Sequence, residues 1–105
     1  MNTFKDREKG FENKFVHDLE LQFRANARRN RLLGHWAAQL LGKSGDEEVR
    51  YAIEVVKSDF QEAGHEDVVR KLVADLGHLA DEETIRAKMA EYLEVAKEQL
   101  MTETG

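Results

Sequence analysis

The sequence predicts an all-α protein, a small four-helix bundle that carries a flexible, marginally helical N-terminal arm. The 105-residue chain has no proline and only seven glycines, so few positions interrupt a helix. Apolar residues recur at intervals of three and four, the spacing of a helix with one buried face, and they do not alternate as in a strand. The four helical stretches are joined by short connections, and because each would be marginal alone, we expect them to pack together.

The first helix is expected to run from about Phe15 to Leu41 and to end at Gly42. The second is expected to begin behind Asp46 as its N-cap and to end before Gly64. The residues expected on the buried face of the first helix are Leu32, Leu33, Trp36, Ala37, Leu40 and Leu41. Those expected on the buried face of the second are Val49, Ala52, Ile53, Val56 and Phe60.

The third and fourth helices are predicted in the same way. The third is short and ends near Gly77, and Asp81 is the expected N-cap of the fourth. The predicted buried residues of the third helix are Val68, Val69, Leu72, Val73 and Leu76. Those of the fourth are Ile85, Met89, Tyr92, Leu93, Ala96 and Leu100.

Charge divides the chain into two parts. Residues 1–31 contain eight Lys/Arg and five Asp/Glu, a net charge of +3, whereas residues 32–105 contain eight Lys/Arg and sixteen Asp/Glu, a net charge of −8. Because an acidic body would repel phosphates, we expect no nucleic-acid partner. The absence of cysteine excludes disulfides, thiolate metal sites and a cysteine nucleophile. No apolar run is long enough to insert into a membrane, so we expect a cytoplasmic protein.

We predict that residues 1–18 form the arm and residues 19–105 the bundle, as a single domain. Large apolar residues in and beside the arm are spaced seven, four, four and four apart, which places them on one side of a helix: Phe4, Phe11, Phe15, Leu19 and Phe23. This stripe fits a helix that enters a groove of a partner protein. The alternative is that it extends the first core helix and packs on the bundle.

A basic cluster follows the arm, in which the arginines are Arg24, Arg28, Arg29 and Arg31. Guanidinium groups bind phosphate in a bidentate manner, so an adenine nucleotide is one candidate ligand, with Trp36 or Tyr51 as a stacking surface. The alternative is a solvated face that pairs with acidic residues such as Asp59, Glu62 or Asp75. No glycine-rich phosphate-binding motif accompanies the arginines.

The sequence gives no support for an enzyme or a metal site. The four histidines are scattered, and the segment GHEDVV lacks the second histidine of a helical zinc motif. Ser44 and Ser58 have no partner base at a meaningful spacing. His35 is expected to be either a residue on the surface of a helix or a core residue with its hydrogen bonds made. His17 lies where protonation could change how the arm meets the body.

Three segments carry a resemblance to a known family: FKDREKGFENKFVHD, ARRNRLLGHWAAQLLG and VVKSDFQEAGHEDVVRKLVADL. In this order they resemble the zeta-subunit family, small inhibitor subunits of the F-type ATP synthase of alphaproteobacteria. The resemblance covers nearly the whole chain. It implies a four-helix bundle whose N-terminal region inserts at a catalytic interface between the alpha and beta subunits and blocks ATP hydrolysis.

The resemblance also implies the partners and their contacts. The partners would be the alpha and beta subunits of the synthase, with the gamma subunit as a further candidate. This chain would be a monomer when free and peripheral to the inner membrane when bound to the synthase. The contacts implied in the arm are Phe4, Arg7, Glu8, Phe11, Glu12, Lys14 and Phe15. The alternative function is a stand-alone helical interaction module or a sensor of adenine nucleotides, and it predicts that the arm packs on the body.

Overall fold

The computed structural model describes the backbone of residues 3–60 and 64–104, and the side chains of residues 18–60 and 64–103. These residues form only helices and their connections, which confirms the all-α prediction. The elements are α1 (Thr3–Leu40), α2 (Gly45–Ser58), α3 (Glu66–Leu76), the 3-10 turn η1 (Gly77–Leu79) and α4 (Glu82–Thr104).

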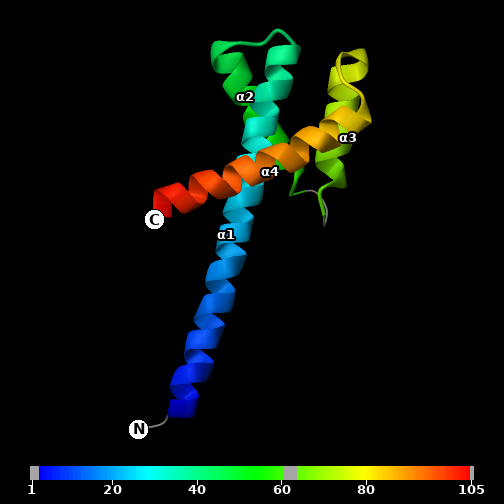
Figure 1. Ribbon diagram of the computed structural model, residues 1–105. Coiled ribbons are helices and arrows are strands. Elements are labelled where there is room, and N and C mark those ends of the chain that lie inside the picture. The colour runs from blue at the N-terminus through cyan, green and yellow to red at the C-terminus, as the bar shows by residue number, and fades with distance from the viewer. Residues whose placement is uncertain (1–2, 61–63, 105) are drawn as a thin grey trace.

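Helix α1 is the axis of the molecule. It begins at Thr3 rather than near Phe15, so the predicted arm is the first part of the same continuous helix. The other three helices pack against its C-terminal half, and its N-terminal half projects away from them (Figure 1). The molecule is therefore elongated, with extents of 63 × 27 × 21 Å. Gly42 ends the helix as predicted, because its positive φ of 79° turns the chain out of the helical conformation.

One apolar core joins the four helices. Its buried residues are Leu33, Ala37, Ala38, Tyr51, Val55, Val68, Val69, Leu72, Leu76, Ile85 and Met89, with Trp36 and Tyr92 partly buried against them. The predicted faces of α3 and α4 are confirmed, except that Val73 is 39% exposed. The predicted cap of α4 is also confirmed, since Asp81 Oδ1 accepts a hydrogen bond of 2.8 Å from the backbone N–H of Thr84.

The side of α2 that faces the core was predicted wrongly. Three residues expected in the core are exposed instead: Val49 by 50%, Ile53 by 48% and Phe60 by 63%. Ala52 is buried as predicted, but its buried companions on α2 are Tyr51, Val55 and Ser58. Ala52 is buried because the backbone of α2 approaches α1 at Gly34, where only small residues fit. The cap was also misplaced, because α2 begins behind Ser44 rather than Asp46.

The contact at Gly34 gives a testable prediction. A Cβ on Gly34 would lie 2.6 Å from Ala52 Cα, a backbone atom that cannot move without moving α2. Gly34→Ala would favour an isolated helix by about 1 kcal/mol. Here we expect it to lower the free energy of unfolding by about 1–3 kcal/mol, measured by urea denaturation, because the two backbones must separate. A more stable variant would contradict the close contact.

Candidate functional sites

The N-terminal segment of α1 is the first candidate site. Phe4, Arg7, Glu8, Phe11, Glu12, Lys14 and Phe15 all belong to α1. Their side chains lie outside the described residues, so the predicted contacts stay a prediction. The described side chains that follow, Asp18, Leu19 and Glu20, are exposed. Among the described side chains of α1, Ala25 is the first buried one. The body is therefore packed without a contribution from residues 18–20.

The four arginines are not gathered on one surface. Arg24 and Arg31 are exposed, whereas Arg29 is only 3% exposed and lies inside the body. Arg28 donates two hydrogen bonds to the carboxylate of Glu103, of 2.5 and 2.9 Å. This hydrogen bonding raises the pKa of Arg28 and lowers the pKa of Glu103. Binding of an adenine nucleotide by the four residues together stays a prediction.

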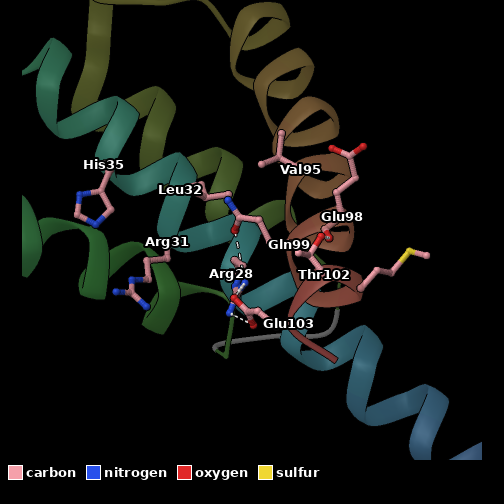
Figure 2. A pocket seen from close by; sticks show the side chains of 10 residues that line it. Arg28, Arg31, Leu32, His35, Val95, Glu98, Gln99, Thr102 and Glu103 are labelled. Carbon is pink, nitrogen blue, oxygen red and sulfur yellow. Dashed lines mark hydrogen bonds and ion pairs between the residues drawn. The ribbon is translucent and has the colours of Figure 1, made fainter. Parts of the chain in front are cut away.

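An open groove of about 1110 Å³ lies between α1 and the end of α4. Figure 2 shows Arg28, Arg31 and His35 on one wall and Glu98, Gln99 and Glu103 on the other. The side chain of His35 is hydrogen-bonded to Glu48 of α2, with 2.7 Å between His35 Nδ1 and Glu48 Oε2. His35 therefore has a hydrogen-bonding partner within the protein, as one of the two interpretations of the sequence predicted. Because both signs of charge line the groove and Arg28 is already paired, its lining is not uniformly suited to an anion.

A polar cluster formed by the buried Arg29 and Asn30, the largely buried Asp59 and the partly exposed His65 was not foreseen as a unit. Asn30 is fully buried and donates from Nδ2 to Asp59 Oδ2 at 2.9 Å. Arg29 donates from Nε to Asn30 Oδ1 at 3.0 Å, and its Nη2 lies 3.7 Å from Asp59 Oδ2. Burial lowers the pKa of Arg29, against the opposing effect of Asp59. Asp59 was among the acids expected to pair with the arginines, but the sequence carried no signal that Arg29 would be buried.

His65 completes this cluster from the residue before α3. Its Nδ1 lies 3.0 Å from Arg29 Nη2 and 2.9 Å from Asp59 Oδ1. That nitrogen can accept from Arg29 or donate to Asp59, but it cannot do both at once. The cluster thus joins α1, the end of α2 and the start of α3 through polar contacts alone.

The ring of Tyr51 is not accessible for stacking on an adenine nucleotide, so the role predicted for it from the sequence was wrong. The residue is 6% exposed, and its hydroxyl donates to Asp75 Oδ2 at 2.8 Å. The ammonium of Lys71 lies 5.2 Å from the centre of its ring. Burial, followed by the hydrogen bond to Asp75, raises the pKa of Tyr51. Asp75 pairs with Tyr51 and Lys71 rather than with the arginines.

Within the described part of the chain, no group of three His, Asp or Glu side chains is placed to hold a metal ion. None of the described helices is long and apolar enough to cross a bilayer. The side chain of His17 lies outside the described residues.

The fold defines a small all-helical protein, a bundle with one helix that extends far beyond the core. The family model for ATPase inhibitor subunit zeta matches residues 1–99, so the chain belongs to this family, as the sequence indicated. The chain is similar to a protein whose solution NMR structure has been solved, with 58% sequence identity and a TM-score of 0.74. The match covers 79% of this chain and 98% of the chain in that structure. A comparison with curated proteins returned no match. Family membership supports the role of an ATPase inhibitor that associates with an ATP synthase.

Removing the carboxylate of Asp59 tests the buried cluster. Asp59→Ala leaves the Arg29 charge inside the body without its acidic partner, so we expect a loss of about 3 kcal/mol in the free energy of unfolding. Urea denaturation followed by circular dichroism measures it. Asp46→Ala is the matched control on the exposed side of α2, with an expected change within about 0.5 kcal/mol. Equal effects would contradict the role of the cluster.

The lowered pKa of Asp75 gives a prediction about the stability of the fold at low pH. Burial raises its pKa, but hydrogen bonds from Tyr51 and Lys71 outweigh that effect, and the net pKa is lowered. Asp75 therefore stabilises the fold above its unfolded pKa of about 3.9, and this stabilisation is lost as the pH falls through the lower folded pKa. We expect Asp75→Asn to be less stable at neutral pH and to lose stability more gradually below about pH 4, measured by urea denaturation over a pH series. An unchanged slope would contradict this assignment.

Proposed function

We propose that the chain inhibits ATP hydrolysis by the F-type ATP synthase by inserting the N-terminal segment of α1 at a catalytic interface between the alpha and beta subunits. The observation that carries the proposal is the projection of this segment from the body (Figure 1). Residues 3–18 extend about 24 Å at 1.5 Å per residue. That length reaches well into an interface while the body stays outside it.

The segment has the composition of a helix that binds in a groove. Phe4, Phe11 and Phe15 recur at helical spacing, so on a helix they share one side. Arg7, Glu8, Glu12 and Lys14 lie between them in the sequence. In the proposed complex the phenylalanines fill apolar pockets of the interface, and the charges set the register and orientation of the helix.

The proposed mechanism needs no catalytic residue in the inhibitor. In the proposed complex, a helix wedged between the two subunits blocks rotation. The energetic cost lies in ordering the segment, about 1–2 kcal/mol for each residue that becomes helical only on binding. Continuity with α1 lowers this cost, because a helix that is already nucleated in the body can propagate into the segment.

The alternative of a stand-alone module that never meets the synthase expects the arm to pack on the body. The direction of α1, which carries the segment away from α2, α3 and α4, favours the inhibitor instead (Figure 1).

Truncation tests the proposal directly. We expect full-length protein to inhibit ATP hydrolysis by the purified catalytic sector of the cognate synthase, and protein that begins at Leu19 not to inhibit. Because Ala25 is the first buried side chain of α1 among those described, the truncated protein should keep its circular-dichroism melting curve. Inhibition by the truncated protein would overturn the proposal, and so would a collapsed bundle.

A point variant sharpens the test. Phe11→Ala should raise the concentration needed for half-maximal inhibition about tenfold or more, since truncating an aromatic anchor costs about 2 kcal/mol. Lys9→Ala is the matched control in the same segment, because Lys9 is not among the predicted contacts. An equal effect of both variants would argue against phenylalanine anchors.

A further inference from the structure

Helix α2 has a second apolar side that the bundle leaves uncovered. We call it the α2 stripe: Val49, Ile53, Val56 and Phe60, spaced four, three and four apart on α2 and the residues directly after it. Val49, Ile53 and Phe60 are each about half exposed or more, at 50%, 48% and 63%. Phe23 of α1, itself 57% exposed, extends the stripe, with its ring centre 6.0 Å from that of Phe60.

The stripe is not needed to complete the core. The opposite side of α2 already buries Tyr51, Ala52 and Val55 against the other helices. Single exposed apolar side chains need no explanation, but a continuous row on one helix marks an interaction surface.

The end of the stripe is hollowed. A cavity of about 250 Å³ opens between Phe23 and Phe60, and its lining includes Ala27 and Val56. The lining also includes the polar residues Asn26, Asn30, Asp59 and His65. A cavity of this size accepts one large apolar side chain of a partner, in the manner of an interface anchor.

Unpaired positive charge flanks the stripe. Arg50 and Lys57 lie three residues before and four residues after Ile53, so on the helix they are its neighbours, and both are exposed. Arg24 follows Phe23 and is exposed as well. Among the described residues these three cations form no ion pair, whereas Arg28, Lys71 and Arg86 elsewhere on the body are paired with acids. Acidic residues also lie one turn from these cations: Asp46, Glu47 and Glu54 around Arg50, with Glu54 three residues before Lys57 as well. Glu54 lies 3.6 Å from the ammonium of Lys71, and Asp59, at the end of α2, is engaged in the buried cluster.

We propose that the α2 stripe docks an acidic amphipathic helix on the surface of the synthase, separately from the inhibitory segment. This inference rests on the proposed function and adds a second contact to it. The row spans about 16 Å, the length of three turns of a helix. Apolar residues of the docked helix cover Ile53 and enter the cavity at Phe60, and its Asp and Glu residues face Arg24, Arg50 and Lys57.

The charges disfavour a second copy of this chain as the occupant. Pairing two copies through the same surface would bring Arg50 and Lys57 of one close to the same residues of the other. Like charges at a helix pair destabilise it, whereas an acidic helix meets the cations with opposite charge.

Binding to the immobilised catalytic sector and inhibition of its ATPase activity, measured in parallel on the full chain, test the proposal. We expect Ile53→Glu/Phe60→Glu to raise the Kd at least tenfold while saturating protein still inhibits fully, because the inhibitory segment is intact. Arg50→Glu/Lys57→Glu should slow association and weaken its dependence on salt. Val73→Glu, on an exposed apolar position of α3, is the matched control and should bind within twofold of the wild type.

Melting curves establish that the variants fold, and Ile53→Ala supplies a milder change with an expected weakening of a few-fold. Stripe variants that bind as tightly as the wild type would overturn the docking surface and leave the proposed function standing. Loss of inhibition at saturation with unchanged Kd would also overturn it, because the stripe would then act in the inhibitory step. A wild-type dimer that Ile53→Glu dissociates, with unchanged affinity for the sector, would make a second copy the occupant. If wild-type protein fails to bind the sector at all, the proposed function fails as well.

Discussion

The close approach of α1 and α2 at Gly34 and Ala52 is the constraint on which the rest of the body depends. Because neither helix carries a large side chain there, the two backbones come together, and a Cβ on Gly34 would already clash. That contact fixes which side of α2 faces inward and brings the end of α2 beside the earlier turns of α1. Asn30 thereby meets Asp59, and Phe23 meets Phe60. A buried cluster and an exposed aromatic pair both follow from one position without a side chain.

The polar cluster then makes this arrangement specific. Apolar surfaces alone tolerate small sliding movements, but a buried Asn30 that must reach Asp59, and a buried Arg29 that must stay near it, permit only one register. Ion pairs on the surface contribute less, since Arg28–Glu103 and Arg86–Glu66 are exposed to solvent and screened by salt. Specificity of packing therefore comes from a few polar groups that are largely buried.

Separate parts of the molecule are suited to separate tasks. The body is held by its own core, and the N-terminal part of α1 projects from it (Figure 1). The α2 stripe is exposed on the surface of the body. An inhibitor built in this way can gain affinity from one surface and inhibition from another. Affinity contributed by the body raises the effective concentration of the segment at its target, so the segment itself need not bind tightly.

The sequence by itself determined the helical class, the positions of α3 and α4, the Asp81 cap, the stop at Gly42 and the family. These depend on local spacing, on single residues with special backbone preferences, and on motifs that survive in the linear order. Only the tertiary structure decided which side of α2 is buried, because Val49–Ile53–Val56–Phe60 and Tyr51–Ala52–Val55 both have helical spacing. The choice between them lies in contacts with distant residues: Gly34 accepts Ala52, and Asp75 accepts the hydroxyl of Tyr51. The sequence left the surroundings of the arginines open for the same reason, since burial of Arg29 depends on Asp59 about thirty residues away in the chain.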